Sequence, residues 1–165
     1  MGHRLGISPH TGWAACVVVG GSLAQPVIVA NEVIDLLDDA ERFCFHMAEK
    51  MNRSDAATWI ASARKKALAH AKRALAPLVG GGIELCAIVA KAGGARSLDE
   101  VLASHPRIHT AEGQFYRDVL RAACSVPVHL VAPSSLDVAK VGKLAGPPWG
   151  KDQKLAALAA WSVER

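Results

Sequence analysis

Residues 5–12 read LGISPHTG, and this stretch decides how the rest of the chain is interpreted. Its apolar first half predicts a short buried strand over residues 4–8, and the proline and glycine that follow predict a tight turn. A second strand, rich in valine, is expected over residues 14–19. Because so few residues separate the two strands, they are expected to pair antiparallel as a hairpin.

Antiparallel strands come first, and helices alternate with strands afterwards. A third strand, at residues 26–37, is expected to complete an antiparallel meander, and the apolar run at 83–91 has the composition of a strand buried on both faces. Pro77 and the glycines at 80–82 end the longest helix, because neither residue type continues a helix readily. Helices are expected over residues 38–51, 54–76, 110–123, 134–144 and 150–163, with a further short helix that begins at Ser97. Asp38 with Glu41, and Ser97 with Glu100, have the spacing of a capping box, and Ser54 is expected to cap the helix at 54–76. One more strand is expected over residues 126–131.

This order predicts an α/β fold in a single domain over residues 1–165. A mixed five-stranded sheet with helices on both faces is expected, since antiparallel strands lead and alternating units follow. Hydrophobic residues make up 51% of the chain and charged residues 21%, which is typical of a globular domain with a substantial core. No apolar run approaches the ~18 residues that span a bilayer, and no signal peptide is recognisable, so a cytoplasmic location is expected.

The four cysteines are far apart in the sequence and form no CxxC pair. Three lie in apolar surroundings, so buried free thiols are expected rather than a disulfide framework or a structural zinc site. The net charge of +4 is compatible with nucleic-acid binding without establishing it. Acidic residues dominate positions 31–49 and basic residues dominate 50–73, which predicts an acidic edge beside a basic helix.

Several segments of the sequence resemble the RuvC-type Holliday-junction resolvases, a family with the ribonuclease H-like fold. The opening strand and turn match that family's L-G-I-D-P-G-T pattern except at Ser8 and His10. The apolar run at 86–91 resembles a central strand of the family, which ends there in glutamate. Residues 112–136 resemble the family's next helix, the strand after it and the start of a further helix. Lys140, Gly142 and residues 150–154 are similar to the family's basic loop and lysine-containing helix. The resemblance covers about residues 4–160 and implies a three-layer ribonuclease H-like fold.

The resemblance also implies a chemistry for which this sequence lacks the residues. In that family four carboxylates bind two magnesium ions, and Mg²⁺ is a hard ion that prefers charged oxygen ligands. Ser8 takes the place of the first carboxylate, and Lys91 stands where the alignment expects an acid. The family's last two acids lie beyond the lysine-containing helix, where this sequence offers only Glu164. We therefore expect no metal at this site and no metal-dependent cleavage.

Two groups of basic residues are the candidate nucleic-acid contacts. The first lies on the long predicted helix and either follows a phosphate backbone or forms an ordinary solvated face. The second surrounds a proline–glycine loop whose tryptophan either stacks on an unpaired base or folds back over the core. The candidates are Arg64, Lys65, Lys66, Lys72 and Arg73 in the first group, and Lys140, Lys143, Trp149, Lys151 and Lys154 in the second.

Two polar pairs offer alternative active sites. Glu32 and Asp35 could supply relocated metal ligands, but alternating acids on an edge strand are typically solvated and discourage strand pairing. Ser8 near His10 suggests a serine nucleophile, but neighbouring turn residues rarely achieve the geometry that this needs.

Histidine and cysteine spacing suggests two further metal sites, each with a simpler interpretation. His105 and His109 have an H-x₃-H spacing, but Pro106 is expected to break any helix that they share. The Cys44-x-His46-Met47 segment could bind a soft metal, but helical spacing favours core positions for the cysteine and the methionine.

The sequence therefore predicts a non-catalytic, RuvC-like nucleic-acid-binding protein in which Ser8 and Lys91 replace metal-mediated phosphate contacts with direct ones. Two alternatives stay open: a magnesium-dependent endonuclease that acts on branched DNA with relocated acids, and a protein-interaction scaffold that binds no nucleic acid. The expected partner is nucleic acid, DNA rather than RNA. No membrane partner and no cofactor are expected, and a homodimer is an option.

Overall fold

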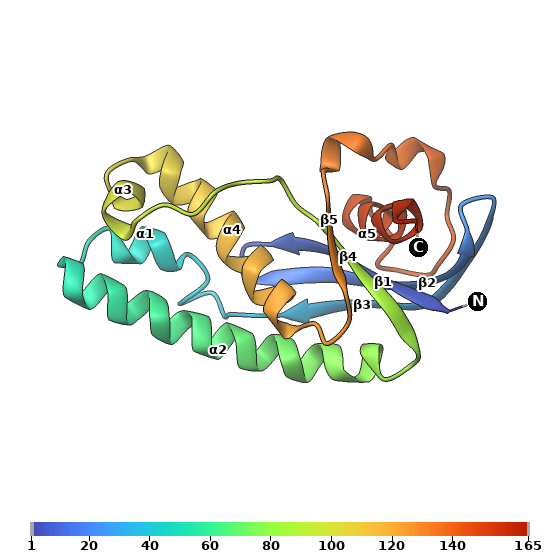
Figure 1. The fold of residues 1–165 in the computed structure, drawn as a ribbon, viewed down its shortest axis with the longest axis horizontal. Coiled ribbons are helices and arrows are strands. Elements are labelled where there is room, and N and C mark those ends of the chain that lie inside the picture. Colours follow the sequence, from blue (N-terminus) through green and yellow to red (C-terminus); the bar gives the residue numbers. More distant parts are fainter. Residues whose placement is uncertain (1, 165) are drawn as a thin grey trace.

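The computed structural model describes residues 2–164 and contains a five-stranded mixed sheet in the order β3-β2-β1-β4-β5. β2 pairs antiparallel with both β1 and β3, whereas β4 lies parallel to β1 and to β5. The predicted mixed sheet is thereby confirmed, as is the buried position of β4, which lies between two other strands (Figure 1). The strands are β1 (His3–His10), β2 (Trp13–Ser22), β3 (Gln25–Asp35), β4 (Ile83–Val89) and β5 (Val128–Val131).

The LGISPHTG stretch forms the hairpin that the sequence predicts. Thr11 and Gly12 connect the strands, and Gly12 has φ +88°, a conformation that favours glycine. The strand runs further than expected, through Pro9 to His10. Pairing of β1 with β4 ends at Ile7, so the missing N–H of Pro9 interrupts no hydrogen bond on that side.

Helices cover both faces of the sheet, as predicted (Figure 1). On one face Leu5, Ile7 and Ile88 pack in the main core with side chains of α2 and α4. On the other face Val17 and Ala87 pack against α5. The helices are α1 (Cys44–Ala48), α2 (Arg53–Val79), α3 (Leu98–Leu102), α4 (His105–Ala123) and α5 (Lys151–Ser162), with two 3₁₀ turns at Pro133–Ser135 and Val138–Lys140. Across residues 2–164, no helix combines the length and the apolar character needed to cross a bilayer.

Two of the predicted helices are wrong. The segment expected as a helix over 38–51 is helical only in α1, because the Asp38 carboxylate accepts a hydrogen bond from the Ala40 N–H at 3.1 Å and holds a turn. The segment expected as a helix over 134–144 forms 3₁₀ turns, the second of them capped by Asp137. The capping box of Ser97 and Glu100 on α3 is confirmed.

The boundaries of α2 also differ from the prediction. Its N-cap is Asn52, whose side chain accepts from the Asp55 N–H at 2.9 Å, and not Ser54. Pro77 lies inside the last turn instead of ending the helix. A proline so close to the end removes a single helical hydrogen bond, and the helix then ends at Gly80.

The described cysteines are free thiols, as predicted. Cys16, Cys44 and Cys86 are buried, and Cys124 is half-buried. Burial raises the pKa of the Cys44 thiol to about 12. A hydrogen bond with the Cys124 thiol, together with burial, raises the pKa of Cys86. The Cys44 and Cys86 thiols are therefore poor nucleophiles near neutral pH.

Candidate functional site

Ser8 lies in the last part of β1 and is 4% exposed. Strand pairing shows which residue of β4 lies beside it. Ile7 and Ile88 form the last pair between β1 and β4, so the same register places the next residue, Val89, alongside Ser8. Lys91 lies past the end of β4, is exposed, and accepts a hydrogen bond on its carbonyl from the Arg117 guanidinium at 3.2 Å. Lys91 therefore lies beyond the paired part of β4 and not beside Ser8, and the register places the buried Val89 there instead.

An acid does lie beside Ser8. Asp152 is in the first turn of α5, and its Oδ1 is 2.7 Å from His10 Nε2. The Ser8 hydroxyl donates to the same carboxylate oxygen at 3.5 Å. Beyond the lysine-containing segment Glu164 is the only acid, but Asp152 lies within that segment and is the site residue that the sequence interpretation missed.

Close packing of α5 on β1 holds Asp152 in place. Ala156, Ala157, Ala159 and Ala160 are fully buried. A Cβ atom at Gly6 would overlap the carbonyl of Ala156, so the two backbones approach closely only because residue 6 has no side chain. Asp152 lies one turn before Ala156 on the same side of the helix, which directs its carboxylate to the end of β1. The run LAALAA at 155–160 was the available signal, since a helix apolar on all sides is a buried helix.

The imidazole of His10 is held on two sides. Asp152 contacts its Nε2, and the ring stacks on Trp13 with 4.3 Å between ring centroids and 6° between planes. The side chains of His10 and Asp152 are 40% and 29% exposed, so the pair is open to solvent. Trp13 pairs in turn with Asp35 on β3, which places that acid in the same row as His10.

These residues do not fit a two-magnesium centre. The donors at the end of β1 are one carboxylate, one imidazole and one neutral hydroxyl, whereas two Mg²⁺ ions need several anionic oxygens between them. Asp35 is two strand spacings from His10, about 10 Å, because Trp13 of β2 pairs with both residues and β2 lies between them. Glu32 pairs with Cys16, whose side chain lies in the core on the opposite face. Neither relocated acid therefore reaches this site.

A serine nucleophile is not assembled either. Activation of serine requires a base in hydrogen-bond contact with the hydroxyl, with a further group orienting the base. Here the Ser8 hydroxyl and the His10 ring both contact Asp152, so the carboxylate lies between them. The arrangement is better suited to holding His10 in a fixed orientation at the surface.

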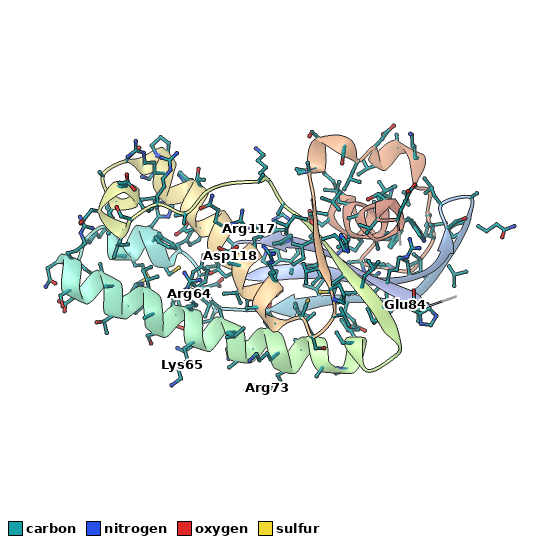
Figure 2. The ribbon with its side chains drawn as sticks, in the orientation of Figure 1. Arg64, Lys65, Arg73, Glu84, Arg117 and Asp118 are labelled. Carbon is teal, nitrogen blue, oxygen red and sulfur yellow. The ribbon has the colours of Figure 1, made fainter. Side chains whose placement is uncertain are left out.

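The first basic group does not form one surface. Figure 2 shows Lys65 and Arg73 pointing away from α2 into solvent, while Arg64 points toward α4. The Arg64 guanidinium lies 5.0 Å from the centroid of the Phe115 ring. Lys66 contacts the Glu41 carboxylate at 2.6 Å, and Lys72 lines a hollow between the C-terminal ends of α2 and α4. Of this first basic group, Lys65 and Arg73 point into solvent, whereas Arg64 and Lys66 contact other parts of the protein.

The second basic group lies on the α5 side of the sheet. Lys151 and Lys154 are in the first turn of α5, on either side of Asp152 in the sequence. Lys140 and Lys143 are exposed in and after the second 3₁₀ turn. Trp149 folds back over the small core between α5 and β2, and its indole N–H donates to the Gly142 carbonyl at 2.8 Å. Because α2 packs on the other face of the sheet, the two basic groups lie on opposite sides of the molecule.

The fold is similar to that of solved RuvC structures. No protein-family model matches the sequence, and a comparison with curated proteins finds no match. The structure of T. thermophilus RuvC in complex with a Holliday junction substrate superposes over 98% of this chain and 91% of its own, with a TM-score of 0.53 and 15% identity. A second Thermus thermophilus RuvC structure superposes over 96% of this chain and 91% of its own, with a TM-score of 0.51 and 14% identity. The predicted resemblance is confirmed at the level of the fold: this chain has the ribonuclease H-like architecture of the RuvC structures.

Proposed function

We propose that this protein binds nucleic acid with the α5 side of its sheet and does not cleave it by two-metal chemistry. The observation that carries the proposal is the Asp152–His10 contact of 2.7 Å at the end of β1. The carboxylate that could have contributed to a metal site is engaged by an imidazole, and the neighbouring strand position holds Val89. What remains at this end of the sheet is a set of hydrogen-bond donors and lysines.

The charges around α5 favour phosphate. Residues 137–154 contain four lysines and two aspartates. One of the aspartates is occupied in capping the second 3₁₀ turn, and the other contacts His10. Lysine side chains bind the DNA backbone by replacing condensed counterions, so this surface is expected to give salt-sensitive binding.

The similar RuvC structure supports DNA as the nucleic acid, since that protein is seen with a Holliday junction substrate. By analogy, we propose that branched DNA is bound more tightly than linear duplex or RNA. The proposal requires no Mg²⁺ for binding, and a cytoplasmic location and a homodimer stay predictions.

Fluorescence anisotropy with labelled DNA tests the binding surface. The wild type is titrated with a four-way junction, a linear duplex and a double-stranded RNA at several salt concentrations. In the double variant Lys151→Gln/Lys154→Gln, each lysine removed is expected to weaken binding of the junction roughly 10-fold relative to the wild type at about 0.1 M salt. For this variant, the slope of the logarithm of the association constant against the logarithm of the salt concentration is expected to be less steep by about 1.8.

The matched control is Lys65→Gln/Arg73→Gln, which removes the same amount of charge from the outer side of α2. We expect it to bind the junction like the wild type. If the control weakens binding and the α5 variant does not, the α2 side is the contact surface. If the wild type shows no salt-dependent binding to any of the three ligands, the protein is a scaffold and the proposal is wrong.

A cleavage assay tests the enzymatic alternative. A labelled four-way junction is incubated with the wild type and with Asp152→Asn in Mg²⁺ or Mn²⁺. We expect no product above background with either protein. Nicks that disappear with chelator and in the Asp152→Asn variant would show that this carboxylate is part of a working metal site.

A further inference from the structure

Three histidines converge at the other end of the molecule from α5. His46 belongs to α1, and His105 and His109 belong to the start of α4 (Figure 1). The Nε2 atoms of His105 and His109 are 3.1 Å apart. One ring nitrogen from each of the three lies within 4.8 Å of the others, and within residues 2–164 no other group of three or more metal-ligating side chains is so close.

The sequence interpretation rejected this pairing because Pro106 was expected to break the helix. That expectation was wrong, since α4 begins at His105 and Pro106 lies in its first turn. Proline is tolerated there because the first N–H groups of a helix have no intrahelical partner. His105 and His109 are therefore one helical turn apart on one face, the i, i+4 arrangement that brings two imidazoles to one ion.

The third histidine is placed by the core. On α1, Cys44, Phe45 and Ala48 are buried, and the Phe45 ring packs edge-on against Phe115 of α4 at 6.0 Å between centroids. His46 is thereby turned toward the first turns of α4, with 4.7 Å between its ring centroid and that of His109. The cluster therefore joins two helices that are far apart in the sequence.

Glu112 supplies an independent indication of a metal site. Its side chain is 3% exposed, and one carboxylate oxygen accepts from the backbone N–H of His46 at 3.2 Å and contacts His46 Nδ1 at 2.8 Å. A buried carboxylate is costly unless it is fully engaged. With Nδ1–H donating to Glu112, the lone pair of His46 is on Nε2, which is the orientation found in carboxylate–histidine–metal arrangements.

We propose that His46, His105 and His109 bind one Zn²⁺ ion, with Glu112 as the carboxylate that orients His46. Tetrahedral zinc with bonds of 2.0–2.1 Å to nitrogen separates two histidine nitrogens by about 3.3 Å, close to the 3.1 Å observed between His105 and His109. Three imidazoles favour zinc and its transition-metal neighbours over Mg²⁺ or Ca²⁺. Because His105 and His109 are exposed, the fourth position faces solvent and takes a water.

Metal titration of the untagged full-length protein tests the site, because an affinity tag of histidines would itself bind zinc. Zn²⁺ is titrated calorimetrically, and Co²⁺ is titrated with detection of visible absorption, which is intense for four-coordinate cobalt. We expect one ion per chain. The thermal midpoint of unfolding should also rise with Zn²⁺, since an ion that joins α1 to α4 binds only the folded state.

Variants assign the ligands. His105→Ala and His109→Ala change exposed residues, so both should fold, and each is expected to lose the zinc heat, the cobalt absorption and the thermal shift. Glu112→Gln is expected to weaken zinc binding by about 10–100-fold while keeping one ion per chain. The control is His129→Ala, an exposed histidine on β5 outside the cluster, which should bind zinc like the wild type.

Three results would overturn the proposal. The first is a wild type that binds no zinc or cobalt under these conditions. The second is zinc binding that is equal in His109→Ala and in the wild type, since the metal would then lie elsewhere. The third is Mg²⁺ competing with Zn²⁺ at equal concentration, because a three-imidazole site does not bind a hard ion so well.

Discussion

Gly6 decides, at the scale of single residues, whether the candidate site can form. The residue lies two positions before Ser8 on the face of β1 that α5 covers, and the Ala156 carbonyl occupies the space where a side chain would begin. The contact involves backbone on both sides, so no rotation of a side chain relieves it. Any larger residue must move α5 away from the strand, and Asp152 moves with the helix.

Gly6→Ala is therefore expected to lower the free energy of unfolding by about 1–3 kcal/mol, the usual effect of overpacking a core. Urea denaturation followed by circular dichroism measures the change. Gly142→Ala is the matched control, since no atom lies within 4 Å of its added Cβ, and it should be neutral or slightly stabilising. Equal stability of Gly6→Ala and the wild type would show that α5 does not pack so closely on β1.

The sequence was sufficient to identify Ser8 but not its partner. Ser8 follows a pattern of apolar residues and turn residues that lies within one hairpin, so local rules locate it. Asp152 is 144 residues away, and its place depends on how α5 docks, which in turn depends on Gly6 and Ala156. Local patterns contain no information on such a contact. The histidine cluster was recognised only in part: His105 and His109 were set aside because Pro106 was expected to break their helix, and His46 was not connected to them because it lies on another helix.

At the scale of elements, the N-cap of α2 was not predictable from the local sequence. Both Asn52 and Ser54 are good N-cap residues, and they are separated by a single position. The apolar stripe of α2 is compatible with a start at either residue. The choice depends on the turn that leads from α1 into α2, where Asn52 has the extended backbone of a cap and contacts Asp55.

The cap can be tested by two parallel substitutions. Asn52→Ala is expected to lower the free energy of unfolding by about 1 kcal/mol, because the Asp55 N–H loses its acceptor. Ser54→Ala is expected to be neutral or slightly stabilising, since alanine has the better propensity inside a helix. Chemical denaturation of both variants measures the difference. The reverse order of effects would place the start of the helix at Ser54.

At the scale of the whole molecule, the sheet separates regions with different chemistry. The α5 side carries the lysines and the His10–Asp152 pair, whereas the far end of the α2 and α4 side carries the histidine cluster. Fold class, the mixed sheet and the two-sided helix cover followed from the order of elements in the sequence, because those features depend on the alternation of apolar segments. The docking of α5, which creates the first region, did not.

If the backbone at the end of β1 still has the geometry of a metal site, one added carboxylate should partly restore metal binding there. Ser8→Asp places a second carboxylate beside Asp152 in a position that is 4% exposed. Two such charges repel in a buried setting, so the variant is expected to unfold at a lower temperature than the wild type. Mn²⁺ should reverse that loss by binding between the two carboxylates, since an ion that binds only the folded state stabilises it.

The Ser8→Asn variant separates the effect of charge from that of size, because asparagine has nearly the volume of aspartate but carries no charge. It should be insensitive to Mn²⁺, as should the wild type, whereas Ser8→Asp should bind Mn²⁺ about tenfold more tightly than either, a difference of about 1.4 kcal/mol. Thermal melts with and without Mn²⁺, in a His109→Ala background that removes the histidine cluster as a competing site, measure the effect. If Mn²⁺ stabilises all three proteins equally, the metal binds elsewhere and position 8 is not part of a metal frame. If it stabilises only Ser8→Asp, the geometry for holding a divalent ion is intact, and the native serine is the reason that the protein does not use it.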